Sequence, residues 1–334
     1  MNRIVEFSHP GLQFKLSTRS RKRGQAFEFD SGSTTTGVRY WNNENTHFRK
    51  FIKTRGKYIL NEKSEGLVPE VQEGELLFWG EFEAPSRFTK LDPIDSRLYP
   101  NAIHEPFMDG TAPGLHNTDP YVFGDYFYYS NCKQLRGSMT ALAVGSVILF
   151  GTEYAEGFAL DTVFVVGERI SAREYLDSKE TFSPILRRAT LDHNHFYNSE
   201  TKLVLYKGKM FTHPTFEEDE LQIFSFFPCK PFNEETRTGF QRPLLDYSAF
   251  NLQSPGAGTV LYNVKKTISD EEVNEYWQKV VAEVIAQGYS LGVYAEEPPM
   301  AHHEKFDEQL HFQKVKNSQI GGCGKGKISL LKTC

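Results

Sequence analysis

The sequence has few cysteines and no long hydrophobic run. Its four cysteines, Cys132, Cys229, Cys323 and Cys334, are widely separated and form no C-x-x-C motif. A chain of 334 residues can bury a large core without a disulfide framework. The longest apolar run, residues 146–150, is far too short to span a bilayer, and the first residues do not resemble a signal peptide. We therefore expect free thiols, a cytoplasmic location and no membrane partner.

Several well-known motifs are also missing. We detect no internal repeat. Residues 31–37 are rich in Gly, Ser and Thr, but they lack the G-x-x-x-x-G-K-[ST] spacing and precede no obvious helix, so a P-loop is not expected. Residues 193–195 spell His-Asn-His, but a nuclease of the HNH type spreads these residues over a strand, a turn and a helix. We treat that match as accidental.

Aromatic residues, in contrast, are abundant, because Phe, Tyr and Trp make up 14% of the chain. Since β-branched and aromatic residues dominate the recognisable segments, we expect a strand-rich α+β fold. The 27 phenylalanines are assigned mainly to the core. Tyr and Trp carry a polar atom and offer a flat face, so they are also candidates for contacts with a base or a sugar.

The local patterns predict individual elements. Residues 145–151 and 158–166 are apolar and predict two buried strands joined by a short connection. Residues 269–288 predict an amphipathic helix that is capped by Ser at its start and ended by Gly, with a strand returning over 289–294. Residues 85–120 contain six prolines, so regular structure should fade there in favour of an ordered, functional loop.

Charge is distributed unevenly along the chain. Residues 1–63 contain thirteen basic and five acidic residues, a charge of +8, which leaves −13 for the remainder of a chain with net charge −5. This asymmetry predicts a polyanion-facing N-terminal part, while a solvated basic surface that balances the acidic half is the alternative. The phosphate-binding candidates are Arg19, Arg21, Lys22, Arg23, Lys50 and Lys53.

Candidate catalytic residues lie between positions 104 and 132. His104, His116 and Asp119 have the side chains of a general base or a metal ligand, but their spacing matches no metal motif, so no metal is predicted. Cys132 is flanked by Asn131 and Lys133, whose ammonium group would lower the pKa of the thiol and favour a nucleophile. The alternative for Cys132 is a place in the core or in a pocket wall.

Polar side chains beside aromatic residues predict a pocket for a base. Amide and carboxylate groups match the paired donors and acceptors of base edges, and aromatic rings can close over the ring face. A polar loop that caps the sheet through Asx-turns is the competing interpretation. The ligand-binding candidates are Trp41, Trp79, Asn117, Asp119, Tyr128, Ser130, Asn131, Lys133 and Gln134.

The two apolar stretches 145–151 and 158–166 resemble the barrel strands of PUA-like modules, the EVE, ASCH and YTH group. In those modules a Gly-Asp-x-hydrophobic strand precedes one with a Val-rich end, and Ser146 stands here in place of the acidic residue. The two stretches also resemble, more distantly, parts of uncharacterised bacterial proteins that are grouped as nucleotide-modification-associated domains. The resemblance implies a small mixed barrel that grips a modified base, and it assigns no pocket residue.

These observations predict an α+β, strand-rich protein with a PUA-like mixed β-barrel and a second α+β portion. Its parts are a basic N-terminal part and barrel (1–170), the second portion (171–297) and a polar, mobile tail (298–334). We expect recognition of nucleic acid or a nucleotide, in particular of a modified base in a modification or defence setting, without a predicted cofactor. The alternative is a hydrolase or transferase acting on a nucleotide or a phosphorylated small molecule through Cys132 or the histidines. A third hypothesis is protein interaction through the Gly-rich tail.

Overall fold

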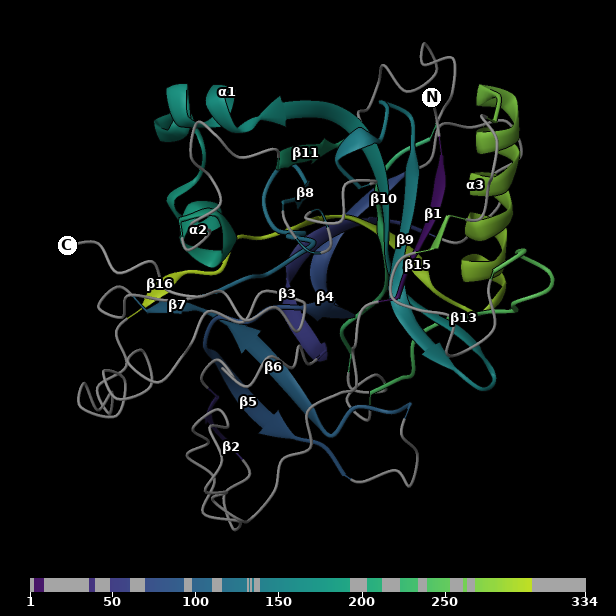
Figure 1. The fold of residues 1–334 in the computed structure, drawn as a ribbon. Coiled ribbons are helices and arrows are strands. Elements are labelled where there is room, and N and C mark those ends of the chain that lie inside the picture. The colour runs from purple at the N-terminus through teal and green to yellow at the C-terminus, as the bar shows by residue number, and fades with distance from the viewer. Residues whose placement is uncertain are drawn as a thin grey trace.

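Strands dominate the fold, and the predicted strand-rich α+β class is confirmed. The computed structural model describes residues 3–8, 36–39, 49–60, 70–92, 98–109, 116–130, 132, 134, 139–192, 203–211, 223–233, 239–252, 261–262 and 268–301. These residues form two seven-stranded sheets, with helices at opposite sides of the molecule (Figure 1). A third, two-stranded sheet joins β7 (Met108–Asp109) and β16 (Met300–Ala301) in parallel. Within the described ranges, no helix combines the length and hydrophobicity needed to cross a membrane.

The first sheet is built around the two apolar stretches that the sequence predicts as buried strands. In spatial order it contains β14 (Leu261–Tyr262), β1 (Ile4–Ser8), β9 (Val147–Tyr154), β10 (Gly157–Ser171), β11 (Val204–Gly208) and β8 (Tyr128–Tyr129), with β13 (Leu244–Leu245) paired to β10. β9 and β10 contain the two predicted strands and pair with each other antiparallel, while β1 lies parallel to β9. Ile148 and Phe150 face one core and Val147 and Leu149 face the other, which explains why β9 is apolar over residues 147–150.

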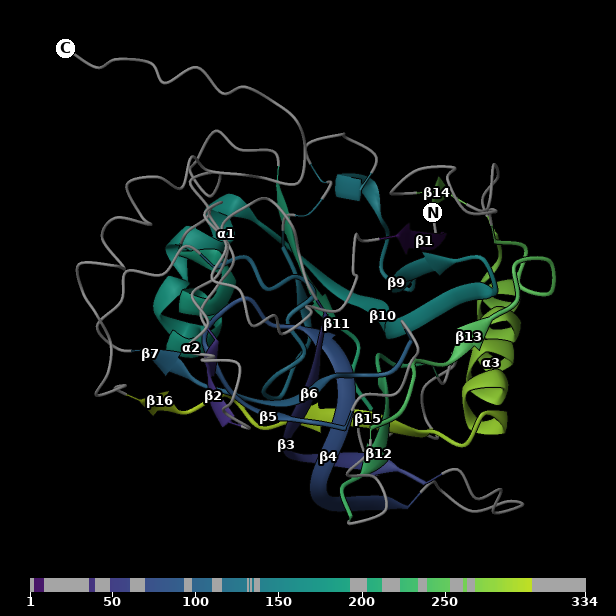
Figure 2. The same ribbon diagram turned by 90° about the horizontal axis from the view of Figure 1, so that it is seen from below.

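The second sheet contains strands from both predicted portions of the chain. Its order is β15 (Ser290–Ala295), β12 (Phe227–Pro231), β4 (Val71–Glu81), β3 (Arg49–Ile59), β6 (Ala102–Pro106), β5 (Ser86–Lys90) and β2 (Thr36–Arg39). β15 pairs with β3 as well as with β12, so β3, β4, β12 and β15 form a closed circuit in which each strand pairs with two others. Figure 2 shows this group lying below β9 and β10.

The proline-rich segment is more regular than the sequence predicts. The expectation that regular structure fades over residues 85–120 is wrong where β5 and β6 pair with each other and β6 pairs with β3. Pro85 immediately precedes β5, Pro100 precedes β6, and Pro106 ends β6. At these places the missing N–H and the fixed φ of proline are tolerated, so the prolines mark the ends of strands.

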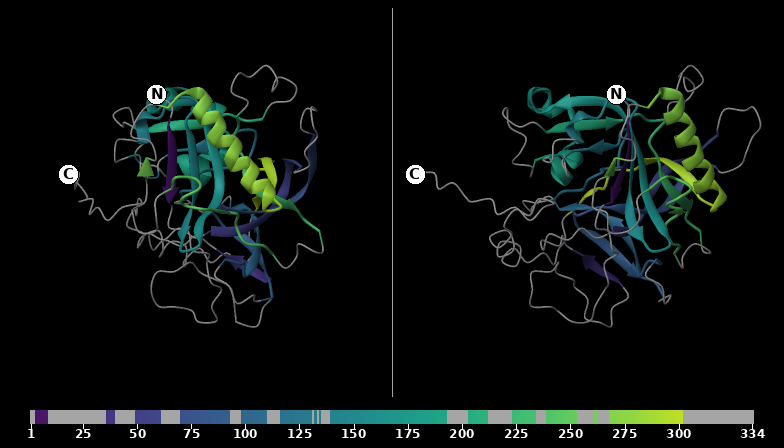
Figure 3. Two further views of the ribbon diagram at one scale, coloured as in Figure 1. Left: turned by 90° about the vertical axis from the view of Figure 1, so that its right-hand side faces the viewer. Right: turned by 45° about the vertical axis from the view of Figure 1, so that its right-hand side comes forward.

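The helices lie where local capping signals predict them. α3 (Asp270–Ala286) begins after Ser269, whose side chain accepts from the Glu272 backbone N–H in a capping box. It buries Val273, Trp277, Val280 and Val284 and lies across the outside of β1, β9 and β10 (Figure 3). On the other side lie α1 (Ala172–Asp177), α2 (Pro184–Leu186), the 3-10 turn η3 (Lys179–Thr181) and the π-helical turn η4 (Arg187–Leu191), while the 3-10 turn η2 (Met139–Ala141) precedes β9.

A β-bulge in β10 shapes the interior. Leu160 pairs with Gly151 and Thr162 pairs with Phe150, so Asp161 is the extra residue on the β10 side. The extra residue shifts the alternation of β10, and it is therefore Val163 and Val165 that continue the core beneath α3 after Phe158 and Leu160. The bulge also places the Asp161 carboxylate against Arg49 of β3 and Arg242. The carboxylate within an apolar strand is thus part of the contact between the sheets.

Candidate functional site

The structure brings together four of the residues predicted for a base pocket in segment 117–134, namely Asn117, Asp119, Ser130 and Gln134, but they bind to one another, to neighbouring side chains and to the backbone. The Asp119 carboxylate accepts from the backbone N–H of Ser130 through Oδ1 and of Cys132 through Oδ2, at 2.7 Å in both cases. Ser130 Oγ lies 3.2 Å from Thr190 Oγ1. Asp119 and Ser130 are completely buried, so their polar atoms organise the chain after β8 inside the protein.

The neighbouring candidates behave in the same way. Asn117 Nδ2 donates to Cys132 Sγ at 3.3 Å, and the Cys132 side chain is buried. Gln134 clamps β11, because its Nε2 donates to the Val204 carbonyl at 2.7 Å and its Oε1 accepts from the Val204 N–H at 2.8 Å. A capping role for this polar segment, the competing interpretation of the sequence, describes these contacts well.

The two candidate histidines occupy different elements. His104 lies on β6, buried, with its Nδ1 3.0 Å from Ser86 Oγ. His116 is also buried and immediately precedes the 117–120 segment. In the part of the chain that the structure describes, no three side chains of the His, Cys, Asp and Glu types are placed to hold a metal ion.

The remaining candidates lie in the core or outside the described residues. Trp79 is buried, and its indole N–H donates to the Phe240 carbonyl at 2.7 Å. Lys50 is buried and donates to the Ala84 carbonyl at 2.8 Å, whereas Lys53 pairs with Glu75 at 3.1 Å. Arg19, Arg21, Lys22, Arg23, Trp41, Asn131 and Lys133 lie outside the described residues.

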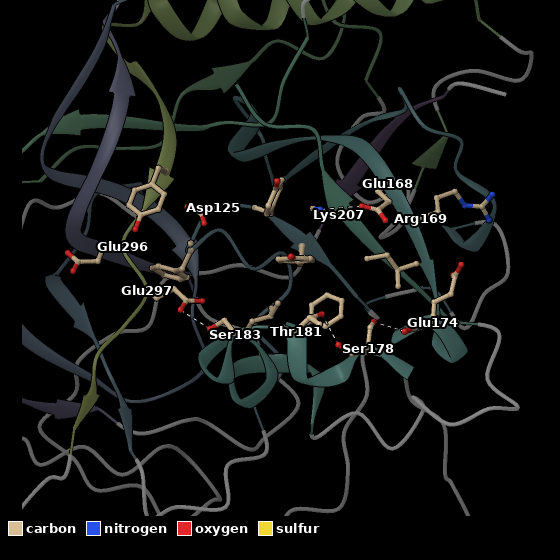
Figure 4. A pocket seen from close by; sticks show the side chains of 18 residues that line it. Asp125, Glu168, Arg169, Glu174, Ser178, Thr181, Ser183, Lys207, Glu296 and Glu297 are labelled. Atoms are coloured by element: carbon tan, nitrogen blue, oxygen red, sulfur yellow. Dashed lines mark hydrogen bonds and ion pairs between the residues drawn. The ribbon is translucent and has the colours of Figure 1, made fainter. Parts of the chain in front are cut away.

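A large open hollow lies on the side of the molecule that carries α1 and α2 (Figure 4). Its volume is about 870 Å³, within the range of roughly 300–1,000 Å³ that ligand pockets span. Five aromatic residues line it, namely Phe123, Tyr126, Tyr128, Phe182 and Tyr294. Five acidic residues also line it, namely Asp125, Glu168, Glu174, Glu296 and Glu297. The basic residues in the lining are Arg169 and Lys207.

Glu297 ties two walls of the hollow together. Its Oε1 accepts from Tyr121 Oη at 3.0 Å, and its Oε2 accepts from Ser183 Oγ at 2.7 Å. Gly124 adopts φ +82°, which favours glycine, and its N–H donates to the Ala295 carbonyl at 2.8 Å. These bonds fix the segment after β15 against the turn before β8 and against the start of α2.

Two ionisable groups of the hollow, Tyr128 and Glu174, have shifted pKa values. Burial raises the pKa of Tyr128 to about 12, so its phenol remains a protonated donor at neutral pH. Hydrogen bonds with Ser171 lower the pKa of Glu174, which keeps that carboxylate charged. Lys207 Nζ lies 3.9 Å from the centre of the Tyr126 ring and 3.3 Å from Glu168 Oε2, so this ammonium is shared between a ring face and a carboxylate.

The sequence predicts one part of the lining of this hollow, the segment around Tyr128, and does not predict the rest. Tyr128 is the predicted ligand-binding residue that lines it, and Phe123 and Tyr126 come from the same aromatic run. Glu168 and Lys207 lie on β10 and β11, and Glu296 and Glu297 follow β15. The adjacent carboxylates directly after a predicted strand were a usable signal, but their proximity to residue 128 depends on the fold.

In comparisons with known proteins, the chain matches no protein-family model, and no curated protein and no solved structure is significantly similar to it.

Proposed function

We propose that the protein recognises a nucleobase, within nucleic acid or as part of a nucleotide, in the hollow beside β8. The observation that carries the proposal is the gathering of tyrosine rings and carboxylates around one space of about 870 Å³. Aromatic faces stack on any base, and this contact contributes about 1–3 kcal/mol per base. Carboxylate oxygens accept from the amino groups that base edges present.

The tyrosines supply two kinds of contact. Tyr126 is exposed, so its ring is accessible from solvent at the rim. Tyr128 is half-buried, and its protonated hydroxyl is a donor for a ring nitrogen or a carbonyl oxygen of the base. An assembly of this type discriminates by shape and hydrogen bonding, which is what recognition of a modified base requires in a modification or defence setting.

The proposal assigns phosphate contacts to the basic N-terminal part, in particular to Arg19, Arg21, Lys22 and Arg23. Three described basic residues of that part, Arg49, Lys50 and Lys53, are engaged elsewhere. Arg49 forms buried ion pairs with Glu81 and Asp161, and Lys53 contacts Glu75. Since carboxylates line the hollow, a phosphate would lie outside it and the base would enter it.

The proposal includes a PUA-like arrangement of the strands in a cytoplasmic protein. Its support is the β9–β10 hairpin, which contains the stretches that resemble those modules, whereas the circuit of pairings among β3, β4, β12 and β15 belongs to the other sheet. The enzymatic alternative receives less support, since Cys132 and Asp119 are engaged inside the fold. We therefore favour a role in base recognition over a role in catalysis.

Binding measurements test the proposal. The purified full chain is titrated with single- and double-stranded oligonucleotides at several salt concentrations, and with the four ordinary nucleosides, by calorimetry. We expect measurable affinity that falls with salt for oligonucleotides, and a loss of about tenfold or more when Tyr128→Ala removes a stacking surface. The matched control is Tyr276→Ala, because Tyr276 is a half-buried tyrosine on α3, at the opposite side of the molecule. Absence of binding to every probe, or equal loss in both variants, would overturn the proposal.

A further inference from the structure

The hollow carries more negative than positive charge. Five carboxylates line it, against the two cations Arg169 and Lys207. Figure 4 shows that they are spread along it, with Glu296, Glu297 and Asp125 toward one end and Glu168 and Glu174 toward the other. Glu297 accepts hydrogen bonds from two neutral hydroxyl groups, and neither bond cancels its charge. A ligand that enters therefore meets a negative potential.

Both lining cations are already engaged. The Arg169 guanidinium donates to the Thr140 carbonyl at 3.0 Å. Lys207 is shared between the Tyr126 ring and Glu168. Arg169 and Lys207 lie away from the end of the hollow that contains Glu296 and Asp125 (Figure 4), so this end keeps its negative charge. Lys57, which pairs with Glu73 at 2.9 Å, lies 5.8 Å from the centre of the nearby Tyr294 ring.

The tyrosines of this hollow already bind cations within the protein itself. Lys207 lies over Tyr126, and Lys57 lies over Tyr294. The two faces of a tyrosine ring carry partial negative charge. A ring face therefore attracts a cation that comes within about 6 Å of the ring centre. Stacking by these rings is therefore strengthened when the stacked group is positively charged.

We infer that the hollow selects a positively charged nucleobase, such as a purine alkylated on a ring nitrogen, over its neutral parent. This inference rests on the proposed function, since it names the class of base that the same hollow takes. A cationic ring gains from the tyrosine faces and from the carboxylates together, and its N–H groups are donors for the carboxylate oxygens. A neutral base gains stacking and hydrogen bonds but no net attraction between opposite charges, and a phosphate is repelled.

Matched pairs of nucleosides test this inference. N7-methylguanosine is compared with guanosine, and 1-methyladenosine with adenosine, by calorimetric titration of the full chain at about pH 6, where carboxylates with ordinary pKa values are ionised. Each methylated nucleoside should bind at least about tenfold more tightly than its parent, and added salt should reduce that preference. Glu296→Gln should reduce the preference at least about threefold, whereas Glu156→Gln, which changes an exposed carboxylate in the β9–β10 turn, should leave it unchanged.

The outcomes separate the two proposals. Equal or tighter binding of the neutral parents would overturn the selection for a positive charge and leave base recognition standing. Binding of neither member of each pair, together with no binding of oligonucleotides, would overturn base recognition itself. A preference that persists in Glu296→Gln and in Tyr294→Leu would show that the charge is read elsewhere, and this too would overturn the inference.

Discussion

Arg49 and Asp161 form a buried ion pair that joins the two sheets, with 2.5 Å between Arg49 Nε and Asp161 Oδ2. Arg49 also contacts Glu81 at 2.6 Å, and Asp161 also contacts Arg242 at 3.1 Å. The two arginines and two carboxylates therefore alternate in one chain of contacts. Coulombic attraction to Asp161 and Glu81 outweighs burial and holds the pKa of Arg49 above its ordinary value, so the guanidinium remains charged.

We expect Asp161→Asn to destabilise the protein strongly. The substitution leaves the buried guanidinium groups of Arg49 and Arg242 without their shared carboxylate, and loss of one partner from a buried pair costs about 3–5 kcal/mol. The free energy of unfolding, measured with a chemical denaturant, checks this. Asp177→Asn is the control, since Asp177 belongs to an exposed pair with Arg173. Equal effects of the two substitutions would contradict a structural role for the buried chain of contacts.

A second prediction distinguishes structural from catalytic roles in segment 117–134. Asp119→Asn places an amide donor against backbone N–H groups that now donate to a carboxylate, at a cost of about 1–3 kcal/mol. Cys132→Ala keeps the backbone N–H of residue 132 that donates to Asp119 and loses the thiol, with its contact with Asn117 and its packing in the core, so its cost should be smaller. Both variants should retain nucleoside affinity, as calorimetry would show. A turnover of a nucleotide that Cys132→Ala abolishes would instead establish the enzymatic alternative.

Much of the fold follows from the sequence because its strongest signals are local. The amphipathic helix over 269–288 is confirmed as α3, since its capping residues and its apolar stripe act over a few turns. The two buried strands predicted over 145–151 and 158–166 are confirmed within β9 and β10 for a related reason, because their apolar patterns are local. The bulge at Asp161 could not be predicted, since it depends on arginines about 110 positions before and 80 positions after it.

The candidate site follows from the sequence less completely. Tyr128, a ligand-binding candidate from the sequence, lines the hollow. The polar residues in the same segment are also predicted to bind a ligand, but a sequence does not show whether a carboxylate faces solvent or the protein's own backbone. Asp119 faces backbone N–H groups, whereas Glu296 lies in the hollow. That difference arises from tertiary contacts, so composition alone does not distinguish the two.

Tyrosine ionisation gives a third prediction. Burial raises the pKa of Tyr128 to about 12, above the value of about 10 in an unfolded chain. The unfolded state then loses the proton first as pH rises, so the stability conferred by the neutral phenol is complete below about pH 10 and is lost toward pH 12. Tyr128→Phe should reduce the slope of unfolding free energy against pH in this window by up to about one proton. A slope that is identical in the variant would contradict the raised pKa.

The last prediction compares two adjacent carboxylates. Glu297→Gln replaces one acceptor oxygen by an amide group that cannot accept from both Tyr121 and Ser183, so we expect a loss of about 1–3 kcal/mol in unfolding free energy. The amide proton of Gly124, which donates to Ala295 beside this junction, should exchange faster with solvent. Glu296→Gln is the matched control, because Glu296 is exposed and should affect ligand preference without affecting stability. If both variants are equally stable and Gly124 stays protected, Glu297 does not hold the walls of the hollow together, and the site must then be shaped by the backbone contacts of β15 alone.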